Sequence, residues 1–302
     1  MRLRNASRIT VAAVLVLGAV TVGSPPPLFV SSDGGDFESI QDAIDTAVPD
    51  GIVVIGRGTY RENLFIDCPI TLIGEDGAAV EPVDPLQAVI AVKDAQSVSI
   101  QGLTIRAEEL GIDLLDSSCA ITDCSVSTSG TAIHSIAFGD TTVRIQNVEF
   151  RGVGGGIGLA LLGTATTLLS RCSFHRLTTG ALIGGVGVTI VHGCTFEQCF
   201  DGIVTLNTVP AMLIENTIRG NYGSGISLSQ HPANLPDETL VLLGNVIEEN
   251  GYWGMSLCGF DAIEPDIQFG QIEGRDNAFR DNRRGRTCPE DLALPAGFFL
   301  EE

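Results

Sequence analysis

The side chains best suited to chemistry gather toward the C-terminal end of this 302-residue chain. Two adjacent aromatic residues are accompanied by a histidine and several carboxylates, namely Tyr252, Trp253, His231, Asp261, Glu264 and Asp266. Aromatic rings present an apolar face, and carboxylates accept hydrogen bonds from hydroxyl groups. Because this combination is typical of carbohydrate recognition, we expect the aromatic pair, with His231 and Glu264, to form a binding site.

The same carboxylates permit two other kinds of site. Asp261, Glu264 and Asp266 offer the oxygen ligands that Ca²⁺ prefers, so a calcium site is the alternative to a protein without metal or cofactor. Glycoside hydrolysis needs two carboxylates about 5–9.5 Å apart, and the candidate acids are Asp201, Asp261 and Asp266. The simpler alternative is that two irregular loops happen to be acidic.

No conventional catalytic motif accompanies these acids. The histidines of the chain are His134, His175, His192 and His231. Their spacing is not that of a metal-binding motif. The residue before each Gly-apolar pair is acidic only at Asp201, and a lone Asp before Gly-Ile is typical of a turn.

A repeated sequence must position these residues. Apolar alternations of nine residues recur eight times between residues 98 and 282, mostly at intervals of 21 to 24 residues. One column of this repeat is Leu103, Cys124, Val148, Cys172, Cys194, Asn216, Asn245 and Asn277. Such a period, broken by Gly and Asn, indicates a solenoid. Insertions at 229–239 and 258–271 lengthen the last two intervals, and loops on a rigid scaffold are where sites are usually built.

The repeat predicts an all-β fold, a parallel β-helix. Each repeat offers three short strands with no helix-length segment between them, which excludes a fold of alternating strands and helices. Residues 36–48 place apolar side chains at helical spacing, so we expect a short N-terminal capping helix with Asp36 as its N-cap. Such a helix covers the open edge of the first coil.

Three stretches resemble a known family. These are GTYRENLFIDCPITLIGEDG (58–77), NTIRGNYGSGISL (216–228) and GNVIEENGYWGMSL (244–257). They resemble right-handed parallel β-helix (PbH1) repeat proteins of the pectin-lyase-like superfamily. The resemblance implies a right-handed β-helix with an internal asparagine ladder at Asn216, Asn245 and Asn277. Because this fold hosts many functions, the resemblance alone does not imply an activity.

The N-terminus indicates export. An apolar run of 15 residues at 9–23 follows a basic start, and a membrane span needs about 20 residues. We therefore expect a signal peptide and a secreted or periplasmic location rather than an integral membrane protein, with an uncleaved anchor as the alternative. The predicted organisation is a signal peptide at 1–23, a linker at 24–35, the capped β-helix at 36–290 and a C-terminal cap or tail at 291–302.

The net charge limits the kinds of partner that the chain can bind, and the positions of the cysteines indicate which of them can form a disulfide. The formal net charge of −20 excludes nucleic acid as a partner, because phosphate binding needs clustered Lys and Arg. It also disfavours a polyanionic polysaccharide unless a local basic patch or a bound cation intervenes. Exported chains permit disulfides, and Cys258 and Cys288 lie outside the repeat columns, so these two are candidates for a pair. We expect the cysteines inside the columns to be small, buried, apolar side chains.

The sequence thus favours an exported β-helix protein that recognises a polysaccharide or another cell-envelope component, without a conventional catalytic site. One alternative is a polysaccharide lyase or glycoside hydrolase of the same superfamily. Another is a periplasmic accessory scaffold, although the chain has only three methionines and no Met- or His-rich patch for metal delivery.

Overall fold

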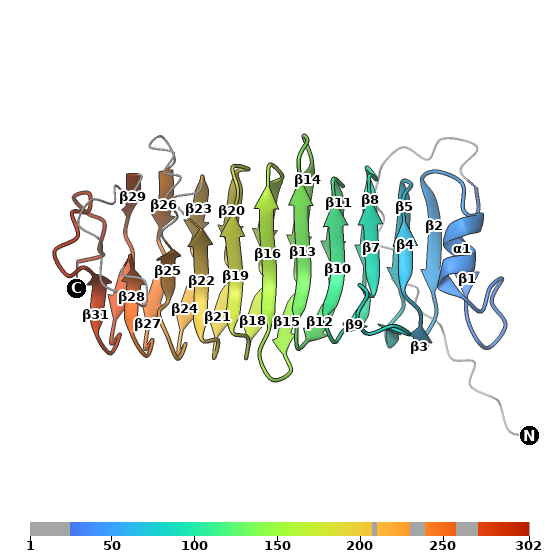
Figure 1. Cartoon of the computed structure of the whole chain (residues 1–302), viewed down its shortest axis with the longest axis horizontal. Coiled ribbons are helices and arrows are strands. Elements are labelled where there is room, and N and C mark those ends of the chain that lie inside the picture. The colour runs from blue at the N-terminus through green and yellow to red at the C-terminus, as the bar shows by residue number, and fades with distance from the viewer. Residues whose placement is uncertain (1–24, 207–209, 230–238, 258–270, 302) are drawn as a thin grey trace, which may run out of the picture.

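The computed structural model of this chain describes residues 25–206, 210–229, 239–257 and 271–301. Parallel strands stack along one axis into three long sheets, with the N-terminal end capped by a helix (Figure 1). The predicted all-β parallel β-helix with a short N-terminal helix is therefore confirmed. Each coil contributes one strand to each sheet, and we call the sheets A, B and C in the order in which a coil enters them.

The strand bounds follow the repeat. Sheet A contains β1 (Leu28–Val30), β2 (Gly51–Ile55), β5 (Ile70–Gly74), β8 (Val98–Gln101), β11 (Cys119–Thr122), β14 (Thr142–Gln146), β17 (Thr166–Ser170), β20 (Thr189–His192), β23 (Ala211–Ile214), β26 (Thr239–Leu243) and β29 (Gln271–Arg275). Strand β1 lies in the segment expected to be a linker and pairs with β2.

Sheet B contains β3 (Gly58–Arg61), β6 (Ala78–Glu81), β9 (Thr104–Arg106), β12 (Ser125–Thr128), β15 (Glu149–Gly152), β18 (Ser173–His175), β21 (Thr195–Glu197), β24 (Thr217–Arg219), β27 (Val246–Glu248) and β30 (Ala278–Arg280). Sheet C contains β4 (Leu64–Ile66), β7 (Ile90–Lys93), β10 (Leu110–Leu115), β13 (Thr131–Ala137), β16 (Ile157–Gly163), β19 (Thr179–Gly184), β22 (Asp201–Leu206), β25 (Ile226–Ser229), β28 (Trp253–Ser256) and β31 (Gly285–Cys288).

The core is a set of side-chain files that run along the axis. Alternate residues of each strand point inward, and strand pairing places like residues of successive coils directly above one another. One aliphatic file in sheet A is Val53, Leu72, Ile100, Ile121, Ile145, Leu169, Val191, Leu213 and Leu242. In sheet B, the rings of Phe150, Phe174 and Phe196 stack with centroids 4.4 Å apart. The in-register pairing therefore turns the sequence repeat into continuous apolar packing.

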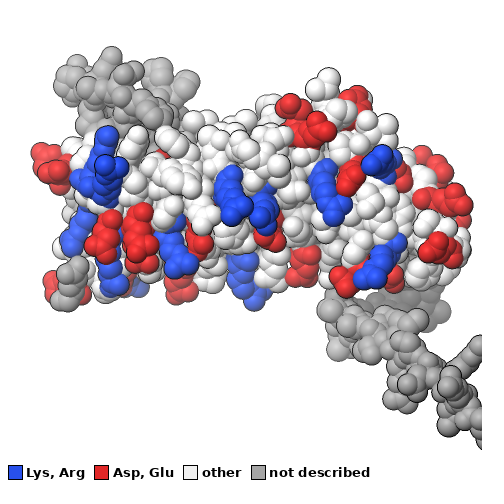
Figure 2. Space-filling model, turned by 90° about the horizontal axis from the view of Figure 1, so that it is seen from below, with Lys and Arg blue, Asp and Glu red and all other residues white. Residues whose placement is uncertain are grey.

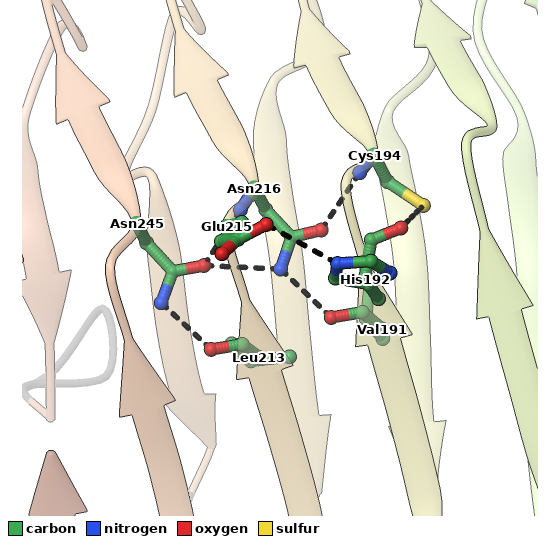
Figure 3. Close-up of polar contacts among 7 residues, drawn as sticks. All are labelled: Val191, His192, Cys194, Leu213, Glu215, Asn216 and Asn245. Carbon is green, nitrogen blue, oxygen red and sulfur yellow. Dashed lines mark hydrogen bonds and ion pairs between the residues drawn. The ribbon is translucent and has the colours of Figure 1, made fainter.

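The predicted asparagine ladder is confirmed. Asn216, Asn245 and Asn277 are buried, and each side chain bonds to the next coil. The Asn245 Oδ1 atom accepts from the backbone N–H of Asn216 at 2.9 Å and from its Nδ2 at 3.0 Å, while Asn245 Nδ2 donates to Leu213 O at 2.7 Å (Figure 3). Asn216 Oδ1 in turn accepts from the backbone N–H of Cys194 at 2.9 Å. Every buried amide of this file thus finds its partners within the file and the adjacent backbone.

A second polar file runs beside the first. Asn221 and Asn250 are buried, and Asn250 Oδ1 accepts from Asn221 Nδ2 at 2.9 Å. Asn282 continues this file, because its Oδ1 accepts from Asn250 Nδ2 at 2.8 Å. Toward the N-terminus the file continues through Cys199, whose backbone N–H donates to Asn221 Oδ1 at 3.0 Å. In the C-terminal coils, side-chain amides therefore hold both the turn before each strand of sheet B and the turn after it.

The two ends of the solenoid are covered. Helix α1 (Ile40–Thr46) buries Ile40, Ala43 and Ile44 against the first coil. The predicted N-cap was wrong: Ser39, not Asp36, caps α1 by accepting from the backbone N–H of Asp42. The carboxylate of Asp36 instead accepts from the backbone N–H of Phe29 at 3.0 Å, because it lies beside strand β1. At the other end, the buried Phe298 ring lies 6.2 Å from that of Phe279.

The cysteines of the repeat are free thiols, as predicted. Cys68, Cys119, Cys124, Cys172, Cys194 and Cys199 form no disulfide. Burial raises the pKa of the Cys124 thiol and of the Cys199 thiol to about 11, which keeps both protonated and unreactive. Cys288 is disulfide-bonded, and its predicted partner, Cys258, lies outside the described residues.

The asparagine ladder makes a stability prediction. Replacing Asn245 by Leu removes the acceptor of two Asn216 N–H groups, so we expect the free energy of unfolding to fall by about 1–3 kcal/mol. Chemical denaturation measures this change, and Val246→Leu, at the neighbouring half-buried position, is the control. Equal stability of the Asn245 and control variants would show that the ladder carries no stabilising hydrogen bonds.

Candidate functional site

The strongest candidate site is the corner where each coil passes from sheet B to sheet C. We call this the B–C corner; it comprises residues 153–156, 176–179, 198–201, 220–225, 249–253 and 281–285 of successive coils. Backbone hydrogen bonds of 2.8 Å join Phe200 N to Leu177 O, Tyr222 N to Cys199 O and Tyr252 N to Gly223 O. Because the turns are bonded coil to coil, their outward side chains form a column at the coil spacing of about 4.8 Å.

The corner is hollowed at its C-terminal end. A cavity of about 660 Å³, which we call the corner groove, extends from the corner along the strands of sheet C from β19 to β31. Its lining includes Phe200, Asp201, Ser227, Tyr252, Trp253 and Arg284. The structure thus brings together three predicted site residues, the aromatic pair and Asp201, which stand about fifty positions apart in the sequence.

The aromatic side chains of the groove are held in place by their neighbours. The Phe200 and Tyr252 rings meet edge to face with centroids 6.4 Å apart. The guanidinium of Arg284 lies 4.3 Å from the centroid of the Tyr252 ring, a favourable cation–π distance. The Trp253 ring lies over Gly285, where φ is +133° and an added Cβ would come within 3.0 Å of the ring. Contacts of this kind reduce the conformational entropy that a ligand must remove when it binds.

Asp201 supplies the acid of the groove. It is the first residue of strand β22, directly after the corner turn, and pairs with Thr179. Its Oδ1 atom accepts from the backbone N–H of Ser224 at 2.7 Å. Burial raises the pKa of the Asp201 carboxyl above its ordinary value of 3.8, and hydrogen bonds from the Ser224 amide and the Ser227 side chain oppose this rise. The groove therefore holds one oriented carboxyl group that desolvation makes easier to protonate.

The other predicted residues fall elsewhere. His231, Asp261, Glu264 and Asp266 lie outside the described residues, so the predicted loop site and the calcium alternative stay predictions. In the part of the chain that the structure describes, no group of three or more His, Cys, Asp or Glu side chains could hold a metal ion. The residues that sequence reasoning missed are Phe200, Tyr222 and Arg284. Phe200 and Tyr222 each follow directly on the second ladder position of their repeats, Cys199 and Asn221, and that shared offset was the available signal.

The outer face of sheet B beside this corner is lined by charges. Pairing places Glu197, Arg219, Glu248 and Arg280 in one row. Arg219 lies 2.7 Å from Glu197, and Figure 2 shows acidic and basic side chains beside one another toward the C-terminal end of the molecule, at the left. Exposed pairs of this kind contribute about 0–1 kcal/mol each, so this row has a structural explanation and needs no ligand.

Known proteins share the fold. Residues 131–288 match the family described as "Right handed beta helix region". The crystal structure of pectate lyase Pel9A has a TM-score of 0.67 at 12% identity and covers 93% of this chain and 79% of its own. An alginate lyase from Paenibacillus sp. str. FPU-7 has a TM-score of 0.58 at 13% identity, with coverage of 87% and 96%. At such low identities these similarities establish the fold alone.

Part of the sequence is similar to a cell surface protein. A 93-residue stretch is 32% identical to a cell surface glycoprotein of Methanothermus fervidus, over 30% of this chain and 16% of the glycoprotein. The match therefore spans a small part of that protein's length. Among the described residues, no helix is both long and apolar enough to cross a membrane.

The raised pKa of Asp201 makes a prediction about pH. A carboxyl whose pKa is higher in the folded than in the unfolded state stabilises the fold relatively more at low pH, and that contribution is lost as pH rises from 3.8 through the folded pKa. Asn does not titrate, so the stability of Asp201→Asn relative to the original protein should increase between pH 3.5 and pH 7. Urea denaturation at both pH values measures this. A relative stability that is constant, or that falls as pH rises, would contradict the assignment of Asp201 as desolvated.

Proposed function

We propose that this chain, which belongs to the right-handed β-helix family, is an exported protein that binds a carbohydrate chain along its B–C corner. The single observation that carries this proposal is the column of aromatic side chains at that corner. Phe200, Tyr222 and Tyr252 come from three successive coils, and Trp253 stands beside the last of them.

The exposure of these rings supports binding. Tyr222 is 68% exposed and Phe200 is 37% exposed. Aromatic rings on a solenoid surface lower solubility unless they are packed or used. A sugar ring offers an apolar face to each aromatic ring and hydroxyl groups to the polar atoms beside it, which here belong to Asp201 and Ser227.

The axial arrangement also favours an extended ligand. The aromatic positions repeat at the coil spacing of about 4.8 Å, so a polymer lying along the axis can contact several coils at once. Contacts on several coils add their free energies while only one molecule is immobilised. The proposed export agrees with the basic and apolar N-terminus and with the sequence similarity to a cell surface glycoprotein.

Asp201 favours a second candidate, a glycan-cleaving enzyme. Its raised pKa suits a proton donor, but glycoside hydrolysis by two carboxylates needs a second acid. Among the described residues that line the corner groove, Asp201 is the only acid. If Asp201→Asn abolishes release of reducing ends while binding is retained, the enzyme is favoured; if both are unchanged, Asp201 serves neither role.

The binding proposal is tested with aromatic variants. We expect Tyr222→Ala to weaken retention on immobilised polysaccharides about tenfold, because loss of an exposed stacking ring removes about 1–1.5 kcal/mol of binding energy. Trp253→Ala should act in the same direction. Affinity electrophoresis in gels containing defined polysaccharides measures the retention.

The matched control is Phe138→Ala, because Phe138 is an aromatic residue that is 75% exposed, directly follows β13 and does not line the groove. Its retention should equal that of the original protein. Binding that survives both Tyr222→Ala and Trp253→Ala would place the ligand elsewhere.

A further inference from the structure

A second hollow continues the corner groove toward the N-terminus. It has a volume of about 770 Å³ and shares Thr178 and Phe200 with the corner groove. Its lining includes Arg151, Gly154, Gly155, Arg176, Gln198 and Tyr222. We call it the glycine-loop hollow, because residues 152–156 read Gly-Val-Gly-Gly-Gly.

The hollow holds two arginines that have no carboxylate partner among the described residues. Arg151 and Arg176 are both exposed, and in the described part of the chain neither lies within 4.0 Å of a carboxylate. Arg176 Nε donates a long hydrogen bond of 3.4 Å to Gln198 Oε1. In a protein with a formal net charge of −20, two adjacent cations without acidic partners produce a local positive potential.

The backbone of the loop adds donors. Gly154, Gly155 and Gly156 have φ values of +90°, +130° and +95°, a left-handed run that glycine adopts readily. Within the described residues, the backbone N–H groups of Gly154 and Gly155 donate no hydrogen bond, whereas that of Gly156 donates to Thr178 Oγ1 at 3.3 Å. Successive free N–H groups in such turns form concavities that bind anions.

The charge pattern limits how much anionic charge the ligand carries. Asp201 lies one coil beyond Arg176. Beyond Asp201 the groove holds the aromatic rings, and its other charged side chain, Arg284, lies against the Tyr252 ring. Successive sugars of an extended chain are spaced at about the rise of one coil. A polymer with an acid on every sugar would therefore place one of its charges against Asp201. A glycan with an isolated anionic substituent would place that group in the hollow and its neutral sugars on the aromatic rings.

We propose that the glycine-loop hollow is a subsite for a single oxyanion, a sulfate ester or a carboxylate, carried by an otherwise neutral glycan that occupies the corner groove. Arg151 and Arg176 hold the oxyanion by charge-assisted hydrogen bonds, and the backbone N–H groups of Gly154 and Gly155, which line the same hollow, offer further donors. The subsite rests on the proposed carbohydrate function and determines which glycans are preferred.

The anion subsite is first tested without a glycan. Sodium sulfate is titrated into the full-length protein at low ionic strength while the arginine side-chain Nε–Hε resonances are followed by NMR. We expect saturable shifts of the Arg151 and Arg176 resonances and none of the Arg144 resonance. Uniform shifts of all arginines, or no shift, would overturn the subsite.

The glycan is tested with four polymers: dextran, dextran with sparse sulfate esters, dextran with carboxymethyl groups at the same density, and polygalacturonate. One sparsely substituted dextran should bind about tenfold more tightly than dextran, and more tightly than polygalacturonate. Which of the two binds more tightly identifies the oxyanion as sulfate or carboxylate. If polygalacturonate binds most tightly of the four polymers, the proposal that the ligand carries an isolated anionic group is wrong.

Two double variants with the same change of net charge provide the contrast. R151Q/R176Q should lose the preference for substituted dextran and keep the affinity for dextran itself. R144Q/R171Q removes two arginines that do not line the hollow and should behave like the original protein. If R151Q/R176Q keeps the preference, the subsite is wrong. The proposed function fails separately if Trp253→Ala, a change in the corner groove and outside the hollow, leaves binding of every polymer unchanged.

Discussion

Hydrogen bonding between coils is the constraint on which the rest of this structure depends. Every strand of sheets A, B and C bonds in parallel register to the strands of neighbouring coils, so the position of one coil determines the position of the next. A shift by one residue would turn each inward side chain outward. The asparagine files counter such a shift, because Asn216, Asn245 and Asn277 reach their partners only when the coils are aligned. Where Cys, Val and Leu replace them toward the N-terminus, apolar packing takes over this role.

The same register creates the site. A turn that recurs at one place in every coil produces a column of side chains with fixed spacing, and substitutions in that column change the surface without altering the frame. At the B–C corner the column begins with the glycine loop and Arg176, passes Phe200 and Tyr222, and ends at Tyr252 and Arg284. A cationic hollow and an aromatic groove thus share one edge of a rigid scaffold, which suits a chain-like ligand that lies along the axis.

Much of the fold was predictable from the sequence, because the same residue types recur at the period of one coil. The apolar alternation, the Asn and Cys columns and the short strands all follow from the repeat, and the structure confirms them. Local capping was harder: Asp36 and Ser39 are both good N-caps, and only the position of β1 decides between them. The site was predictable in part. Tyr252 and Trp253 stand out by type, whereas Phe200, Tyr222 and Arg284 gain meaning only when the coils are stacked, since they lie far apart in sequence and adjacent across coils.

The central claim is that a glycan occupies the corner groove. A natural fluorophore of the chain can report this binding directly. Trp253 is the only tryptophan of the sequence and lines the groove, so its fluorescence reports on this place alone. The most direct measurement is the emission spectrum of the full-length protein during titration with a polysaccharide that it retains. The account predicts a saturable change in intensity and wavelength with the same midpoint as binding measured by calorimetry. Calorimetric binding that leaves the Trp253 emission unchanged would contradict it.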